Sequence, residues 1–261
     1  MNLQLNIESL SDQYTSNSQK IRILTETWVS ENMFCPRCAV NHIEKFENNR
    51  PVADFYCEEC KNIYELKSKS GKLSDMINDG AYSTMIERIT SNTNPDFFFM
   101  NYDKNTYEVR NFLVIPKHFF IPNIIIKRKP LSQNARRAGW VGCNIDLTGI
   151  PQEGRIFIIK DGREITKKNV VDNIHKNLFL GGEEISSRGW LLDIMRCIEN
   201  IKAQKFSLSE IYDYEKYLQE LHPNNHNIKA KIRQQLQILR DNGYLEFLGN
   251  GKYVRRSYEE I

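Results

Sequence analysis

Two pairs of cysteines constrain the fold of this chain more than any other feature of its sequence. The first pair is Cys35 and Cys38, the second is Cys57 and Cys60, and 18 residues lie between the pairs. Four thiolates at such spacing are typical of a tetrahedral Zn²⁺ site. Disulfide bonds are the alternative, but they are rare in a reducing cytoplasm. We therefore predict a zinc ribbon over residues 35–60, whose zinc is structural because four cysteines leave no open position for a substrate.

The sequence carries no signal for export or for membrane insertion. The N-terminal residues lack the basic and apolar regions of a signal peptide. The most apolar stretch, residues 112–126, is interrupted by Lys117 and His118 and is too short to span a bilayer. We expect a cytoplasmic protein.

Charge is distributed unevenly along the chain. The 261 residues are enough for about two domains, and 36 basic against 33 acidic residues give a net charge of only +3. Residues 117–168, however, hold 11 Lys and Arg against 4 Asp and Glu, and residues 222–261 hold 7 against 4. Both segments suit a polyanion, but basic residues also occur on ordinary solvated surfaces. Charge alone does not decide between these interpretations.

A second pattern flanks the cysteine pair Cys57–Cys60. The residues on either side of it are predicted to form two short strands, which a turn at the cysteines joins as a hairpin. Asp54 lies on the first strand, and Glu65 and Lys67 share one face of the second. Two neighbouring carboxylates favour a hard cation such as Mg²⁺ between them, and a lysine there can orient or deprotonate a water molecule and stabilise developing negative charge. The alternative is a solvated strand face.

The order of predicted elements indicates an α/β domain with a cleft. An amphipathic helix precedes the first cysteine pair, and a second helix with an apolar stripe follows the hairpin directly. Two buried strands come next. The predicted elements are a helix over 18–32, strands ending at 57 and covering 62–69, a helix over 81–89, and strands over 96–100 and 107–115.

The C-terminal part is predicted to be a winged helix. Residues 180–187 break the periodicity and are the expected linker. Three helices follow, the second opening with a capping box from Ser207 to Glu210, and a β-hairpin over 244–256 completes the unit.

The third of these helices is a candidate for reading DNA. Its apolar stripe leaves Lys229, Arg233 and Gln234 available to face outward, together with Gln237 and Arg240. Such side chains can enter a major groove, and Lys252 on the hairpin adds a further cation. A winged helix that docks onto protein is the alternative.

The segment from Arg136 and Arg137 to Trp140 is a separate candidate. A tryptophan beside two arginines can insert at a base step or contact a methyl group. It can equally be the half-buried anchor of a loop.

Several phrases of this sequence resemble one nuclease family. Residues 51–54 and 65–67 match the PD-(D/E)xK core, except that Ala53 stands where proline is expected. The phrases at residues 46–57, 78–82, 135–140, 187–190 and 231–240 are similar to the DpnI-like family of methyl-directed, type IIM restriction endonucleases, and the similarity covers nearly the whole chain.

This resemblance implies a Mg²⁺-dependent bacterial enzyme that cuts double-stranded DNA at GATC carrying N6-methyladenine, leaving blunt ends. It implies that Asp54, Glu65 and the carbonyl of Leu66 bind the metal, while Lys67 is the base that orients the water. Whether Glu26 on the preceding helix also serves this site stays open. No membrane and no protein partner is implied.

We therefore expect an α/β PD-(D/E)xK domain with an embedded zinc ribbon over residues 1–182, and an α+β winged-helix DNA-binding domain over 183–261. The rival interpretation is a non-catalytic regulator that combines a zinc ribbon with a winged helix. Asp54, Glu65 and Lys67 distinguish the two, because a regulator has no need for such a group.

Overall fold

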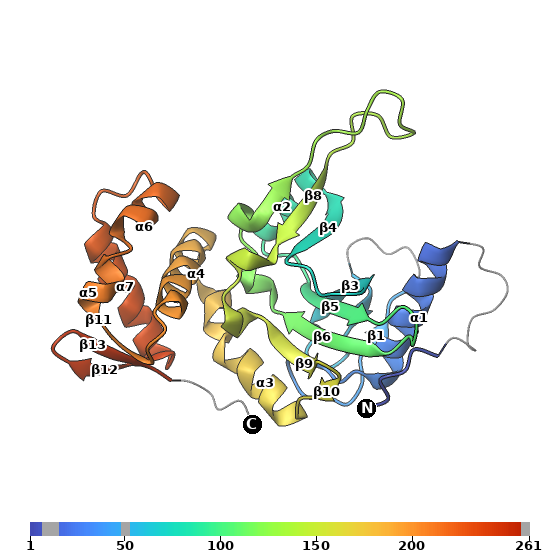
Figure 1. Ribbon diagram of the computed structural model, residues 1–261, viewed down its shortest axis with the longest axis horizontal. Coiled ribbons are helices and arrows are strands. Elements are labelled where there is room, and N and C mark those ends of the chain that lie inside the picture. Colours follow the sequence, from blue (N-terminus) through green and yellow to red (C-terminus); the bar gives the residue numbers. More distant parts are fainter. Residues whose placement is uncertain (7–15, 48–52, 257–261) are drawn as a thin grey trace. The chain divides into compact units, whose positions relative to one another are not determined.

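A computed structural model describes residues 1–6, 16–47 and 53–256 (Figure 1). The chain divides by its contacts into two compact units. The N-terminal unit contains residues 1–149 and 153–175, and the C-terminal unit contains residues 150–152 and the chain from Lys176 onward. The domain boundary expected after residue 182 stays a prediction.

The N-terminal unit is built on a mixed sheet of seven strands. Strands β3 and β5 run parallel, and the other neighbouring pairs are antiparallel. The apolar run of β5 is buried along its whole length, as expected for a central strand covered on both faces. In spatial order the strands are β1 (Glu44–Lys45), β2 (Phe55–Tyr56), β3 (Ile63–Ser70), β5 (Asp96–Tyr102), β6 (Val109–Ile115), β9 (Ile156–Lys160) and β10 (Arg163–Glu164).

Helix α1 (Asn17–Asn32) contacts β1 and β3 and confirms the helix predicted before the first cysteine pair. Its buried side includes Leu24 and Trp28, and the Trp28 ring meets Phe112 of β6 edge-on. This part of the chain also contains the helices α2 (Tyr82–Thr90) and α3 (Lys167–Lys176), and the last residue of α3 already belongs to the C-terminal unit.

The sequence indicated that a helix follows the hairpin directly, but α2 does not. Strand β4 (Met76–Ala81) intervenes and belongs to a separate three-stranded antiparallel sheet, with β8 (Gly142–Asp146) in the centre and β7 (Ile125–Lys127) at the other edge. We call it the small sheet. The sequence did not predict these strands, because they are short and because β4 pairs with a strand distant in the chain.

Short 3₁₀ helices complete the connections between these elements. Their bounds are Lys117–Phe119, Pro122–Ile124, Leu147–Gly149, Gln152–Gly154 and Leu178–Gly182.

The C-terminal unit has a helical core and its own three-stranded antiparallel sheet with strand order β11-β13-β12. The apolar stripe of α7, which includes Ile232 and Leu236, is buried against neighbouring helices such as α4. The elements are α4 (Ile185–Asn200), β11 (Lys205–Ser207), α5 (Leu208–Tyr212), α6 (Glu215–Leu221), α7 (Ile228–Asp241), β12 (Leu245–Gly249) and β13 (Lys252–Arg255).

Two local predictions for this unit are confirmed and two are wrong. The capping box between Ser207 and Glu210 forms at the start of α5, and the hairpin over β12 and β13 turns at Gly249–Gly251, where all three residues have positive φ. The predicted linker is wrong in its second half, because α4 already begins at Ile185. The predicted second helix is divided into α5 and α6.

Within the described residues, no helix has the length and apolar character required to cross a membrane.

Candidate active site and metal centre

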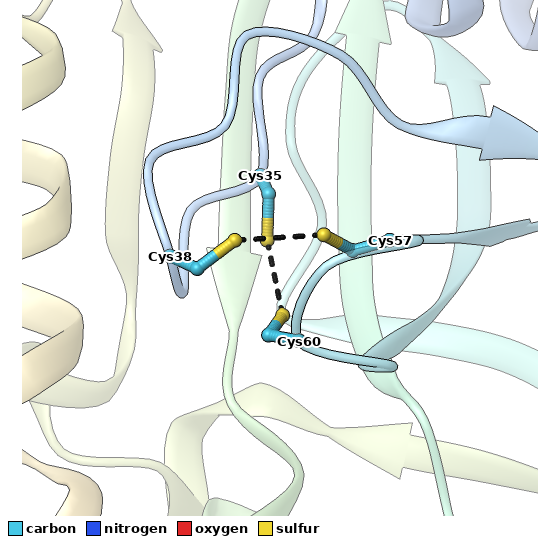
Figure 2. A group of neighbouring side chains, drawn as sticks. All are labelled: Cys35, Cys38, Cys57 and Cys60. Atoms are coloured by element: carbon cyan, nitrogen blue, oxygen red, sulfur yellow. Dashed lines mark hydrogen bonds between the residues drawn. The ribbon is translucent and has the colours of Figure 1, made fainter.

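The four cysteines of the predicted zinc ribbon converge. Cys35 and Cys38 lie on the loop after α1, and Cys57 and Cys60 lie on the turn between β2 and β3. Figure 2 shows their sulfur atoms turned toward a common centre, and all four lie within 4.8 Å of one another.

The sulfur separations fit a tetrahedral zinc. Cys35 Sγ is 3.6 Å from Cys60 Sγ, and Cys38 Sγ is 3.5 Å from Cys57 Sγ. A Zn–S bond of about 2.3 Å places two thiolates about 3.8 Å apart, whereas a disulfide requires about 2.05 Å. All four cysteines are free thiols. The cluster therefore fits Zn²⁺, and the disulfide alternative is wrong.

The two cysteine turns have the same local geometry. The amide of Ala39 donates to the carbonyl of Cys35 at 2.9 Å, and the amide of Lys61 donates to the carbonyl of Cys57 at 3.0 Å. Ala39 and Lys61 both have positive φ, which closes each turn directly after its second cysteine. Each turn thus directs two thiols to one side.

Burial favours the neutral form of two of these thiols, Cys35 and Cys60. It raises the pKa of Cys60 to about 11, and it raises the pKa of Cys35 still further. Cys35 Sγ lies 3.0 Å from the Tyr64 hydroxyl, whose own pKa burial also raises. Because thiolate is the ligand form, metal binding must release protons, and Tyr64 then donates to a thiolate.

The β2–β3 hairpin brings the predicted catalytic residues together. Phe55 pairs with Tyr64 in this hairpin, and Asp54 precedes the first strand. The amide of Leu66 donates to Asp54 Oδ2 at 2.7 Å, and Lys67 Nζ donates to Glu65 Oε1 at 2.5 Å. Asp54 is thus fixed to the segment that carries Glu65 and Lys67. Pro51 and Val52, the first part of the matched motif, lie outside the described residues.

The two carboxylates are crowded and partly desolvated. The pKa of Glu65 is raised to about 7, chiefly by burial and also by the negative charges of Asp79 and Asp54, while Lys67 opposes the shift. Burial also raises the pKa of Asp54. A divalent cation would relieve this crowding, and the hard oxygen donors present suit Mg²⁺. The donor set therefore fits the ion that the sequence indicated.

A third carboxylate, Asp79 of β4, belongs to this group and was missed by sequence reasoning. Its Oδ1 accepts from Lys67 Nζ, so the ammonium lies between Asp79 and Glu65. No sequence pattern could have signalled Asp79, because its strand belongs to the small sheet and β3 to the large one.

Glu26 is buried and paired with cations. Arg22 Nε lies 2.5 Å from its Oε1 and Lys45 Nζ lies 2.8 Å from its Oε2. Arg22 also lies 3.9 Å from Asp54. Glu26 thus contributes charge near Asp54 through this ion-pair network.

Trp140 lies on the segment between β7 and β8. It is half-buried, and the guanidinium of Arg137 lies over its ring at 4.6 Å from the centroid. Its ring covers Gly142, where a Cβ would come within 2.8 Å of two ring carbons. Arg136 and Arg137 are exposed. The geometry is compatible with a loop anchor and with a ring presented to DNA, so both interpretations remain.

Helix α7 presents the predicted polar side chains to solvent. Lys229, Arg233 and Gln234 are exposed, as are Gln237 and Arg240, and Lys252 is exposed on β13. Arg233 Nη1 donates to the Tyr212 hydroxyl at 2.8 Å, and Lys229 pairs with Glu215 at 3.3 Å. Arg233 is therefore hydrogen-bonded to the last residue of α5.

Two family models match the chain. The model described as DpnI, Dam-replacing family, matches residues 1–183. The model described as DpnI_C, Dam-replacing HTH domain, matches residues 186–255. Together they cover both compact units.

Proposed function

The chain belongs to the DpnI, or Dam-replacing, family of restriction endonucleases, and from this premise we propose that it cleaves double-stranded DNA at GATC sites carrying N6-methyladenine. The proposed reaction is Mg²⁺-dependent hydrolysis of one phosphodiester in each strand, giving blunt ends. The N-terminal unit would be a PD-(D/E)xK domain and the C-terminal unit a winged helix that binds the same kind of DNA.

The observation that carries this proposal is the group formed by Asp54, Glu65 and Lys67 on the β2–β3 hairpin. Asp54 and Glu65 supply the carboxylates that would hold the ion, and the carbonyl of Leu66, between Glu65 and Lys67, is a further oxygen donor. Burying two carboxylates close together is unfavourable, because burial raises the pKa of both groups, and a non-catalytic regulator gains nothing from it. The group therefore favours an enzyme over the rival regulator.

Each residue has a distinct proposed role. Bound Mg²⁺ would polarise the scissile phosphate and lower the pKa of a water molecule. Lys67 is held protonated by Glu65 and Asp79, which raise its pKa, so it stabilises negative charge and orients the water rather than accepting its proton. Asp54 and Glu65 act in the ionised form, so Glu65, whose pKa is about 7, must lose its proton to bind the cation.

Recognition of the methyl group requires more than one contact. Burying one methyl group contributes about 1 kcal/mol, which corresponds to about fivefold in affinity. Strong discrimination therefore needs several readings of the methyl groups on the two strands. We propose that Trp140 reads them in the N-terminal unit and that Arg233 and Gln234 act in the C-terminal unit.

The test is cleavage of one plasmid prepared with and without adenine methylation, in Mg²⁺ and in EDTA. Only methylated plasmid in Mg²⁺ should be cut, and Asp54→Ala, Glu65→Ala and Lys67→Ala should abolish cutting while DNA binding persists. Equal cutting of both plasmids would disprove methyl direction. If a hemimethylated duplex is cut as fast as a fully methylated one, recognition of methyl groups on both strands is wrong, whereas methyl direction itself still holds.

A further inference from the structure

Asp79 lies on a strand that the proposed reaction does not otherwise use. In β4, Asn78 and Gly80 are exposed, whereas the Asp79 side chain between them is only 8% exposed. Asp79 shares its face of the small sheet with Cys143, its partner on β8, which is fully buried. The carboxylate is therefore directed inward.

Two donors converge on one oxygen of this carboxylate. Asp79 Oδ1 accepts from Lys67 Nζ, and it also accepts from the amide of Gly80 at 2.7 Å. The backbone bond fixes where the oxygen lies, and the ammonium follows it. Such an arrangement locks a long, flexible lysine side chain into one direction.

Lys67 needs this partner because its other partner has a competing task. Glu65 holds Lys67 in the structure, but the proposed function assigns the Glu65 carboxylate to a cation. A carboxylate that binds a metal shares its lone pairs and its charge with that metal. Asp79 then remains the carboxylate whose full negative charge pairs with the Lys67 ammonium.

We propose that Asp79 is a positioning residue, which acts through Lys67 by holding the ammonium against the reacting phosphate during cleavage. This inference rests on the proposed function and deepens it. Asp79 does not itself touch the substrate. Its removal should therefore slow the chemical step and leave DNA affinity unchanged.

The first experiment observes the contact without using activity. Lysine ammonium protons are visible by ¹H–¹⁵N NMR when hydrogen bonds slow their exchange with water, and the Lys67 signal is assigned by its absence in Lys67→Met. We expect Asp79→Asn to shift or broaden this signal. Asp146→Asn, which replaces the aspartate at the other end of β8 that binds the amide of Thr148, is the matched control and should leave the signal unchanged. An unchanged Lys67 signal in Asp79→Asn would overturn the inference.

The second experiment measures single-turnover cleavage of methylated duplex at saturating protein, beside the dissociation constant of the same duplex. Misplacing a reacting group by about 1 Å can cost about 100-fold in rate, so Asp79→Asn should cut about 10- to 100-fold more slowly with affinity within about twofold. Asp146→Asn should match the parent in both. Parental cutting by Asp79→Asn, or equal losses of rate and affinity, would contradict the positioning role. If the parent protein does not cut DNA, the proposed function itself is wrong, and the NMR result still decides the contact.

Discussion

Individual side chains in the N-terminal unit are held in states that a bound metal would change. Burial raises the pKa values of Glu65 and of the Cys35 and Cys60 thiols, yet these groups bind metals only when deprotonated. Lys67 and Tyr64 lie beside them as donors. Metal binding and proton release are therefore linked at both sites.

Glu65 should make stability depend on pH in the absence of metal. Its ordinary pKa of 4.5 rises to about 7 in the folded protein because burial favours the neutral acid. The folded state then binds more protons than the unfolded state, so the contribution to stability is complete below pH 4.5 and is lost as pH rises through about 7. Between pH 5 and 8 in EDTA, the parent should lose up to about 3 kcal/mol relative to Glu65→Gln. Denaturant unfolding at each pH measures this, and parallel curves for the two proteins would contradict the shift.

The Tyr64 hydroxyl should strengthen zinc binding. Tyr64→Phe keeps the ring that stacks on Phe98 but removes the donor to Cys35. Loss of such a supporting hydrogen bond lowers metal affinity by about tenfold or more. Competition with a chelator at fixed pH measures the change. Tyr56→Phe, on the paired strand, is the control, and equal affinities for both variants would show that the hydroxyl is unimportant.

At the scale of elements, two pairs of strands position the candidate functional groups. The β2–β3 hairpin carries Asp54, Glu65 and Lys67, and its turn holds the second cysteine pair. The second pair, β4 with β8, carries Asp79, which lies beside Lys67, and Gly142, which the Trp140 ring covers. The sequence predicted the first pair because its strands are joined by a short turn, and it missed the second.

Gly142 should control the position of the Trp140 ring. A Cβ at this residue would lie 2.8 Å from two ring carbons, so Gly142→Ala must displace the indole. We expect a stable protein whose preference for methylated over unmethylated DNA falls toward that of Trp140→Ala. The ratio of the two cleavage rates measures this. Gly80→Ala on the neighbouring strand is the control, because a Cβ there meets nothing within 4 Å. An unchanged ratio in Gly142→Ala would favour the loop-anchor interpretation of Trp140.

At the scale of the whole molecule, two family models match two compact units, and each unit carries its own candidate DNA-contacting residues. In the N-terminal unit these are Arg136, Arg137 and Trp140. In the C-terminal unit they lie on α7 and on β13. Two independent readings of one site would multiply small preferences for a methyl group.

The C-terminal unit should fold and bind duplex DNA by itself. The segment should begin at Lys176, because α4 starts at Ile185 and the compact unit extends to Lys176. Its affinity for DNA should fall as the salt concentration rises, because binding releases counterions. The logarithm of the binding constant plotted against the logarithm of the salt concentration should have a slope of about −0.9 for each phosphate contacted. Gel shifts at several salt concentrations measure the slope, and Arg233→Ala should weaken binding. Absent or salt-independent binding would favour the protein-docking alternative.

The sequence by itself determined the features whose residues are close together in the chain. The cysteine spacing predicted the four-thiol cluster, and local periodicity predicted α1, α7 and the β12–β13 hairpin, because a turn or a helix is decided by its immediate neighbours. The roles of Asp54, Glu65 and Lys67 stay predictions, although the hairpin that joins them is present. Only the tertiary structure decided that β4 pairs with β8 and that Asp79 meets Lys67. The β4–β8 pairing joins segments far apart in the chain, and its energy comes from burial and pairing in the folded protein rather than from any local preference.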